Sequence, residues 1–258
     1  SVAQLAMRLW PQYWPDFFDR LLELVADNGA ILESGGAATA IRTEMGLRMA
    51  RMVVDEVHPR EGVGMQKLTW DDARRPELQK ALSMVLPLML QRIYGLLPYC
   101  AAWSGEMLRG ARSLVEALME AFGSIALWTP LEKTEAVAAD ASLVGIAGKC
   151  PDLAGTALEV LGILASRPTR PQEVDFVADM LDTMVDPIMA LLGRYAAEPV
   201  DEGYDNFKRL ADVFVTMATV NIATKKGNGS VGMTGKSNTQ SGPTGPTLPL
   251  PKRMEAIL

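Results

Sequence analysis

The side chains best suited to catalysis are few and lie far apart in this sequence. His58 is the only histidine, and Cys100 and Cys150 are the only cysteines, in a chain of 258 residues. A thiol nucleophile needs a base beside it, and a zinc site needs several ligands at short spacings. Neither cysteine has a histidine near it in the sequence, and His58 precedes Pro59, where it suits the end of a helix. The sequence therefore predicts no catalytic residues, no metal site and no cofactor.

Two glycine-containing stretches near the C-terminus match nucleotide-binding loops only in part. GNGSVG, from Gly227 to Gly232, fits the pattern G-x-G-x-x-G, and SVGMTGKS carries Ser230 where a phosphate loop requires glycine. Such loops bind phosphate when a strand precedes them and a helix follows. Neither stretch has this context, so we interpret both as parts of a low-complexity segment.

Charged side chains on predicted helices are the next candidates. Glu44, Arg48, Arg51 and Asp55 follow one another at spacings that place them on one side of a helix. Oppositely charged residues three or four positions apart stabilise a helix by a few tenths of a kcal/mol, about 0.2–0.5 per pair. We interpret this row as a solvated ion ladder on the back of the helix.

Arginines could instead contact phosphate, because the planar guanidinium donates two parallel hydrogen bonds to it. Arg109 and Arg112 lie on one polar stripe of a helix predicted over 105–127, with Glu116 and Glu120 further along. The simplest interpretation of this stripe is a solvated helix face. We keep Arg109 and Arg112 as candidate contacts for RNA or another partner, together with Arg42.

Helical periodicity positions all these residues, since apolar residues recur every three or four positions from Asp16 to about Thr224. The stripe predicted for 37–57 is Ile41, Met45, Met49, Met52 and Val53. We expect a kink or a break at Pro87 and a split at Pro187, because proline removes a helical hydrogen bond. The predicted helices form about four antiparallel pairs, which favours an α-solenoid: 16–27 with 37–57, 76–99 with 105–127, 131–149 with 152–166, and 172–197 with 203–224.

Composition supports an all-α chain and excludes several classes of protein. Hydrophobic residues make up 48% and aromatic residues only 6%, so the core is built from helix-forming aliphatic residues. The formal net charge of −6 argues against a small, uniformly basic nucleic-acid-binding domain. Two cysteines form no disulfide framework and suit a reducing compartment. No run of about 18 apolar residues is free of charge, so we predict no membrane span.

The chain divides into a helical part, 1–224, and a tail, 225–258. Gly, Ser, Thr and Pro dominate the tail, which we expect to be disordered. The tail carries a net charge of +4 and the helical part −10. The first residues, SVAQLAMRLW, read as the end of a helix, so we expect this chain to be a segment of a longer protein.

The stretch RLWPQYWPDFFDRLLEL, residues 8–24, is more specific than composition. Its WPQxWPD pattern, built on Trp10, Pro11, Trp14 and Pro15, resembles the third-to-fourth-repeat region of nuclear exportins, which belong to the importin-β (karyopherin) superfamily. Each Trp-Pro would end one helix and begin the next, with the indoles wedged into the turn. Further stretches resemble exportins in the same order: RMVVDEVHP, RRPELQKALSMVLPLMLQRIYGLL, ALMEAFGSIALWTPLEKT, LEVLGILASRPTRPQE and YDNFKRLADVFVTMATVNI. The order and spacing over residues 8–222 are most like the exportin-five (Hasty) type.

The resemblance implies a right-handed superhelix of HEAT-like (armadillo-type) repeats and a protein without catalysis of its own. It implies shuttling between nucleus and cytoplasm, with Ran-GTP, nucleoporins and a cargo such as a microRNA precursor as partners and no membrane. Structured RNA would be bound by shape and phosphate contacts rather than by base reading. The first Ran-binding repeats would precede Ser1, so the segment alone should bind Ran weakly or not at all. A general α-solenoid scaffold that binds only proteins is the alternative.

Overall fold

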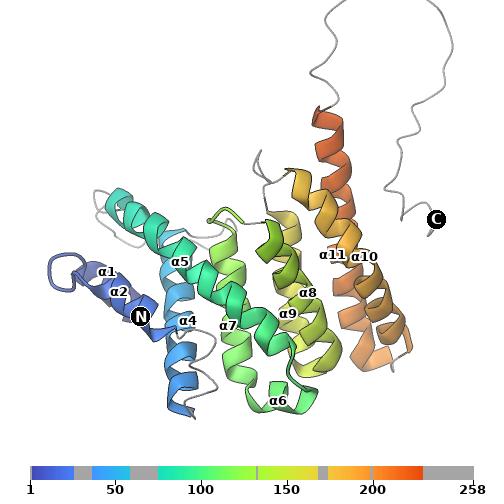
Figure 1. The fold of residues 1–258 in the computed structure, drawn as a ribbon, viewed down its shortest axis with the longest axis horizontal. Helices are drawn as coiled ribbons and strands as arrows, with labels where there is room; N and C mark the ends of the chain where they lie inside the picture. The colour runs from blue at the N-terminus through green and yellow to red at the C-terminus, as the bar shows by residue number, and fades with distance from the viewer. Residues whose placement is uncertain are drawn as a thin grey trace, which may run out of the picture.

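The structure is a computed structural model that describes residues 2–25, 37–58, 75–131, 133–167, 174–197 and 200–228. Within these ranges all regular structure is helical and no strand occurs, which confirms the predicted all-α class. The helices of the described residues run in the order shown in Figure 1: α1 (Val2–Leu9), α2 (Phe17–Leu24), α4 (Ala37–Val57), α5 (Arg75–Ala101), α6 (Gly105–Gly110), α7 (Arg112–Ala126), α8 (Lys133–Lys149), α9 (Pro151–Ser166), α10 (Val174–Ala197) and α11 (Val200–Asn228).

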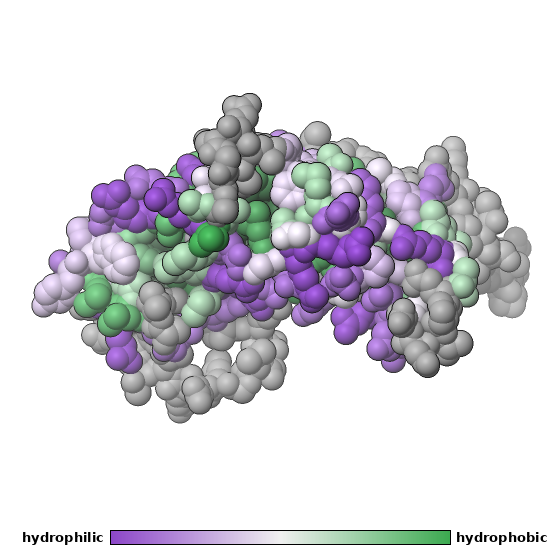
Figure 2. All heavy atoms as spheres, turned by 90° about the horizontal axis from the view of Figure 1, so that it is seen from below, coloured by the Kyte–Doolittle hydropathy of each residue, from purple (hydrophilic) through white to green (hydrophobic). Residues whose placement is uncertain are grey.

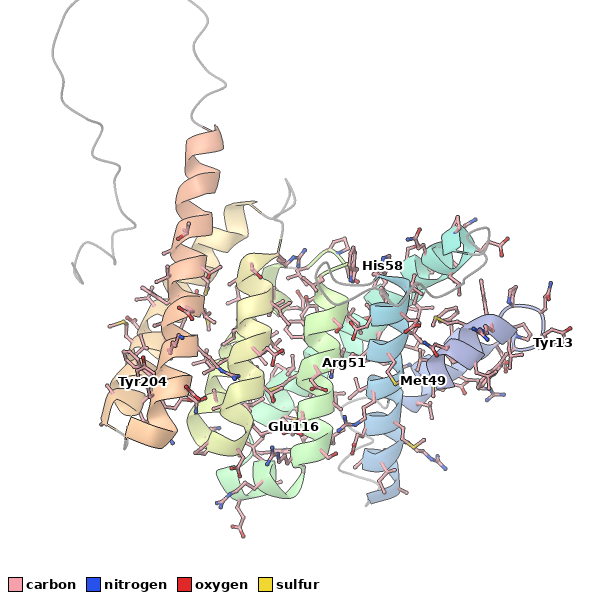
Figure 3. All side chains as sticks on the ribbon, turned by 180° about the vertical axis from the view of Figure 1, so that it is seen from behind. Tyr13, Met49, Arg51, His58, Glu116 and Tyr204 are labelled. Atoms are coloured by element: carbon pink, nitrogen blue, oxygen red, sulfur yellow. The ribbon has the colours of Figure 1, made fainter. Side chains whose placement is uncertain are left out.

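Two layers of helices make up the fold. α2, α5, α8 and α10 follow one another in the first layer, which faces the viewer in Figure 1. α4, α7, α9 and α11 stand side by side in the second layer, which faces the viewer in Figure 3. Each second-layer helix packs on the next, so the four pairs stack as a HEAT-like solenoid. The short α6 lies between the two helices of the second pair.

Prolines inside two first-layer helices do not end them. α5 continues through Pro87 and Pro98, and α10 continues through Pro187. The predicted split at Pro187 is therefore wrong, and no break occurs at Pro87. Pro87 and Pro187 both lie on exposed faces of their helices, where water can satisfy the carbonyl groups that the rings leave without a donor.

The predicted helix over 105–127 is divided instead. α6 ends at Gly110 and α7 begins at Arg112, with Ala111 between them outside helical geometry at φ −104° and ψ 20°. Gly110 explains the interruption, because glycine lowers the helical preference of the chain at this position. Ser104 caps α6, since its side chain accepts a hydrogen bond from the Met107 backbone N–H at 3.3 Å.

The stripe predicted for α4 is only partly right: Val53 is buried in the core and Met49 packs against it, but the other three residues are exposed. Ile41, Met45 and Met52 are 57%, 56% and 41% exposed. Thr43, Leu47, Ala50, Val54 and Val57 form the buried face. Small residues let α4 approach its neighbours closely: a Cβ added at Gly46 would meet the Leu24 Cβ at 2.8 Å. Phe207 on α11 is another large apolar residue at the surface, 36% exposed.

The Trp-Pro turn lies where the sequence predicts it. α1 ends at Leu9, and α2 begins at Phe17. The rings of Trp10 and Phe18 meet edge to face with centroids 5.4 Å apart, and those of Trp14 and Phe17 at 5.1 Å. Both indoles pack against the core, so the prediction that they wedge into the turn is confirmed.

A feature repeated along the first layer is a cation that caps the end of the preceding helix. Arg92 of α5 donates from Nη1 to the carbonyl oxygens of Leu22, at 2.6 Å, and Val25 at the end of α2. Lys149 of α8 donates from Nζ to the Ala101 carbonyl at 2.5 Å, at the end of α5. Arg194 of α10 donates to the Gly148 carbonyl at the end of α8. Each cation completes carbonyl groups at the negative end of a helix dipole.

α5 is one of the long helices in the described ranges. It alone among them contains a window, within Pro76–Ala101, that is long and apolar enough to cross a membrane; 44% of the window is buried inside the fold. α5 packs on α2, α7 and α8, so its apolar residues serve the core of this solenoid.

The second helix of the last pair runs past its predicted end. α11 continues to Asn228, four residues beyond Thr224. Residues 229–258, and with them most of the predicted tail, lie outside the described residues.

Candidate interaction surface

The three arginines predicted to contact a partner lie on three different helices. Arg42 is exposed near the start of α4, Arg109 is exposed on α6, and Arg112 is the first residue of α7. The interruption at Ala111 takes Arg109 off the helix that carries Arg112. The single polar stripe predicted for these two residues therefore does not form.

Arg112 has a carboxylate partner and Arg109 has a backbone one. Arg112 donates from Nε to Glu116 Oε1 at 2.8 Å, and this hydrogen bond raises the pKa of the guanidinium above its ordinary value. Arg109 donates from Nε to the Gly105 carbonyl at 3.4 Å. Both side chains remain at the surface, where their other N–H groups can meet an anionic ligand.

Arg42 faces away from the other two. It precedes Glu44 by two residues, which corresponds to a rotation of about 200° around the helix. Glu44 faces α7, where the Ser113 hydroxyl donates a hydrogen bond to it, so Arg42 lies on the opposite side of α4. The structure therefore does not bring Arg42 together with Arg112.

The charged row of α4 forms contacts between helices rather than a ladder in solvent. Ser113 of α7 donates from Oγ to Glu44 Oε1 at 2.6 Å, and Arg48 donates to the Ser113 Oγ at 3.1 Å. Glu44 also accepts from Arg48 Nε at 2.9 Å. The hydrogen bond from Ser113, followed by the interactions with Arg48, holds the pKa of Glu44 below its ordinary value.

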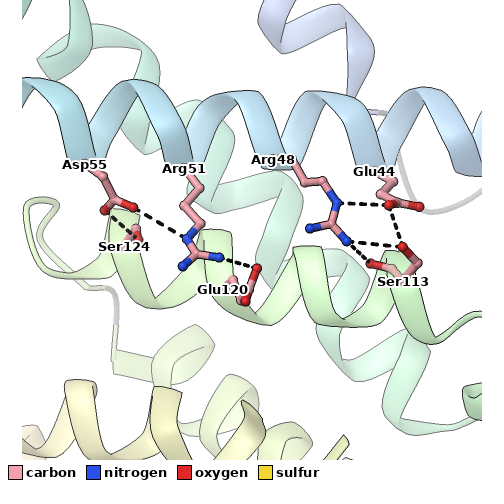
Figure 4. A network of polar contacts seen from close by, with 7 residues as sticks. All are labelled: Glu44, Arg48, Arg51, Asp55, Ser113, Glu120 and Ser124. Atoms are coloured by element: carbon pink, nitrogen blue, oxygen red, sulfur yellow. Dashed lines mark hydrogen bonds and ion pairs between the residues drawn. The ribbon is translucent and has the colours of Figure 1, made fainter. Parts of the chain in front are cut away.

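The later residues of this α4 row also contact α7 (Figure 4). Arg51 forms an ion pair with Glu120, and its Nε lies 3.5 Å from Asp55 Oδ2. Ser124 donates from Oγ to Asp55 Oδ1 at 3.1 Å. The interpretation of these four residues as a solvated ladder on the helix back is therefore wrong, because each of them contacts α7 or a residue that does. We name this set the α4/α7 seam: Glu44, Arg48, Arg51 and Asp55 with Ser113, Glu120 and Ser124.

An aromatic pair closes the seam at one end. The rings of His58 and Trp128 stack with centroids 4.3 Å apart and an interplanar angle of 19°. His58 directly follows α4 (Figure 3). Trp128 follows α7. The position predicted for His58, at a helix end, is confirmed.

Large apolar side chains lie beside the seam on the outer face of α4. Ile41, Met45 and Met52 are exposed, and Met49 is half-buried. From the side of the molecule drawn in Figure 2, hydrophobic surface gathers toward the N-terminal helices and hydrophilic surface covers the middle. The second layer thus offers apolar contact area next to half-exposed arginines.

The C-terminal part of the second layer is more acidic. Asp152 and Glu159 are exposed on α9, and Asp205 and Asp212 are exposed on α11 with Lys208 and Arg209 among them. Arg209 donates to the Gly155 carbonyl of α9 at 3.4 Å. Among the described side chains, the exposed charges of α11 balance, whereas α9 has acidic side chains only, so phosphate would meet repulsion over α9.

The described residues offer little for catalysis. They contain no group of three or more His, Cys, Asp or Glu side chains that could hold a metal ion. Burial raises the pKa of the Cys100 thiol to about 12, which makes the thiolate inaccessible near neutral pH. Burial also raises the pKa of Asp140 on α8 to about 7, against the opposing effect of Arg167, but Asp140 lies inside the core and not on a surface.

The sequence analysis missed that the seam joins two helices. One signal was present: Ser113, Glu116, Glu120 and Ser124 repeat along the helix after the Arg48 and Arg51 row with similar three- or four-residue spacing. Two matching polar rows on consecutive second helices can pair with each other where those helices stack.

One family model matches the chain. It describes an exportin 1-like protein and matches residues 1–161, which span α1 to α8, most of α9 and all of the α4/α7 seam. Neither the search of curated proteins nor the search of solved structures gives a match. The matched part contains the Trp-Pro turn and the first two helix pairs, stacked one on the other. Because the match covers more than half of its residues, the chain belongs to the exportin 1-like family.

Proposed function

We propose that this chain is a segment of a nuclear export receptor that binds Ran-GTP and its cargo together and releases both in the cytoplasm. The family match over residues 1–161 carries this proposal. The two-layer solenoid supports it, because stacked helix pairs present a long surface to a large partner. Directional transport would come from linkage, in which cargo and Ran-GTP each raise the affinity for the other.

We also propose structured RNA, of the microRNA-precursor kind, as the cargo, in line with the resemblance to the exportin-five (Hasty) type. The exposed guanidinium groups of Arg42, Arg109 and Arg112 support phosphate contacts in the N-terminal half. Arg109 is better placed than Arg112, since Arg109 bonds to a backbone carbonyl while Arg112 bonds to a carboxylate.

The acidic side chains of α9 and α11 favour the other candidate, a scaffold or receptor that binds proteins. Asp152, Glu159, Asp205 and Asp212 would attract basic protein segments and repel RNA. Nucleoporin contacts and shuttling between nucleus and cytoplasm belong to the transport proposal and not to the scaffold one.

Binding of the complete protein that carries this segment to Ran tests the transport proposal. We expect Ran loaded with a non-hydrolysable GTP analogue to bind together with a hairpin RNA, each improving the affinity for the other about 5-fold to 150-fold. Ran-GDP should not bind, with or without the RNA. Equal binding of both nucleotide states, or none, would favour the scaffold. The 258-residue segment alone should bind Ran weakly or not at all.

The arginine contacts are tested through the salt dependence of RNA binding. Changing Arg109 and Arg112 together to Ala should weaken binding to all hairpin sequences and reduce the log–log salt slope by about 1 for each phosphate that the variant no longer neutralises. Arg20→Ala is the matched control, because Arg20 is an exposed, ion-paired arginine in the first layer. An unchanged slope in the double variant would assign Arg109 and Arg112 to the solvated surface.

A further inference from the structure

The contacts of the α4/α7 seam follow the same residue order along both helices. Glu44 and Arg48 meet Ser113, Arg51 meets Glu120, Asp55 meets Ser124, and the ring of His58 meets that of Trp128. Residue numbers increase in the same direction on both sides, so α4 and α7 run parallel. Each turn of α4 from Glu44 to Asp55 therefore has a polar contact with α7 (Figure 4).

The neighbouring contact of α7, with α9, is made differently. Gly123 faces α9 directly, since a Cβ added there would be in ordinary van der Waals contact, 3.4 Å from both methyl groups of Val160 and 3.6 Å from Ile163 Cδ1. Val160 is buried and Gly123 is buried. Among the described residues no ion pair within 4 Å joins α7 and α9, although Asp152 at the start of α9 attracts Arg112 at the start of α7 across a longer distance. The α7/α9 contact is therefore apolar and close at this level.

Solvent reaches the seam but not the apolar contact. The side chains of Arg51, Asp55 and Glu120 are 37%, 38% and 29% exposed. Ion pairs at this exposure are screened by mobile ions, with a Debye length of about 10 Å at 0.1 M salt and about 3 Å at 1 M. Apolar burial is not weakened by screening.

We propose that the α4/α7 seam is a joint held by charge, which loosens when its ion pairs are screened, while the α7/α9 contact stays closed. The angle between the first and second helix pairs is then the adjustable one in this part of the solenoid. The buried face of α4, with Leu47, Ala50 and Val54, keeps the helix in the fold when the seam loosens. This proposal is independent of the nature of the cargo.

Hydrogen exchange of the whole chain at low and high NaCl measures the effect. Backbone amides of α4 should exchange about 3-fold to 10-fold faster at about 1 M than at about 0.1 M NaCl, the change expected when several half-exposed ion pairs are broken. Amides of α9 should change little, and they provide the internal control for effects of salt on exchange itself. An α4 that responds to salt no more than α9 would overturn the proposal.

Two variants keep the test specific to charge. Arg51→Met retains an apolar stem and removes the pair with Glu120, so its α4 should exchange quickly already at low salt and lose most of its salt dependence. Arg42→Met is the control on the same helix, on the side turned away from α7, and should behave as the parent. Glu120→Gln removes the same pair from the α7 side and leaves Asp55 with Arg51, so its α4 should also lose part of its salt dependence; a Glu120→Gln variant that responds to salt as the parent does would also overturn the proposal.

Spin-label distances report the joint directly. Labels on Met45→Cys and Arg112→Cys span the seam, and labels on Arg112→Cys and Glu159→Cys span the α7/α9 contact; Cys100 and Cys150 are both buried and should stay unlabelled. High salt should broaden the first distance distribution and leave the second unchanged. Equal broadening of both, or of neither, would contradict a joint located at the seam.

Discussion

The two sides of α7 use different chemistry for the same task. Toward α4 it presents Ser113, Glu120 and Ser124 to a row of charges. Toward α9 it presents Gly123 to the methyl groups of Val160. Both contacts stack one second-layer helix on the next, so the repeat is preserved in geometry and not in side chains. Divergent solenoids can therefore change the strength of single joints without changing the fold.

A charge placed in the apolar contact should have the largest effect. In Val160→Asp a carboxylate would be buried against Gly123 without a partner, which we expect to lower the free energy of unfolding by about 3–5 kcal/mol. Urea unfolding followed by circular dichroism measures the change. Val160→Ala is the control for the reduced volume, and a Val160→Asp variant no less stable than it would refute the description of this contact as dry.

The buried carboxyl of Asp140 on α8 tests the cost of a charge in the core of the third helix pair. Its folded pKa of about 7 lies above the ordinary value, so the neutral form is favoured in the fold and stability falls as pH rises from about 4 to about 7. Asp140→Asn should flatten this dependence, removing about 2–3 kcal/mol of the difference in unfolding free energy between about pH 5 and pH 8. Urea unfolding at both pH values measures it. Parallel pH profiles of parent and variant would show that Asp140 is ionised in the fold.

A larger side chain at Gly123, in the α7/α9 contact, should have the next largest effect on stability. Gly123→Leu places a branched side chain against Val160 and Ile163 and should cost about 1–3 kcal/mol of unfolding free energy. Gly145→Leu on α8 is the matched control, because no atom lies within 4 Å of a Cβ added there. Thermal unfolding of the two variants compares them, and equal melting temperatures would mean that α7 and α9 have room to separate.

The smallest effect is expected at the seam. Ser113→Ala removes the hydroxyl group between Glu44 and Arg48 and should cost about 0.5–1 kcal/mol of unfolding free energy at low salt. The cost should shrink at high salt, where the charges of its partners are screened. Urea unfolding at two salt concentrations measures both costs. An equal cost at both would mean that the Ser113 hydroxyl does not depend on the charges of Glu44 and Arg48.

The sequence predicts the order of helices well because helical periodicity and proline or glycine boundaries act locally. α4 begins and ends where predicted, and the buried residues Val115, Leu118 and Phe122 of α7 recur at the three- or four-residue spacing that predicts a helix. The predicted buried face of α4 is mostly wrong because an apolar pattern picks out large side chains, whereas small ones face the core here. Thr43, Gly46 and Ala50 face the core because they let helices approach, which is a property of the pair and not of the single helix.

The candidate surface is harder to predict for the same reason. The spacing of Glu44 to Asp55 places these residues on one side of a helix, but only the position of α7 decides whether that side meets water or another helix. Arg109 and Arg112 are separated by a change at Gly110 that the apolar stripe does not reveal. Which partner such arginines bind depends on the shape of the whole surface and remains a prediction.

The cations that cap the first-layer helices have a consequence for synthesis of the chain. The end of α2 is completed by Arg92, the end of α5 by Lys149 and the end of α8 by Arg194. In each case the cap is encoded downstream of the helix it completes. A ribosome adds about 5–20 residues per second. The last carbonyl groups of each first-layer helix therefore lack their capping cation for several seconds, until the first helix of the next pair has been made. Nascent chains should therefore gain protease resistance in steps, each set by the arrival of one lysine or arginine.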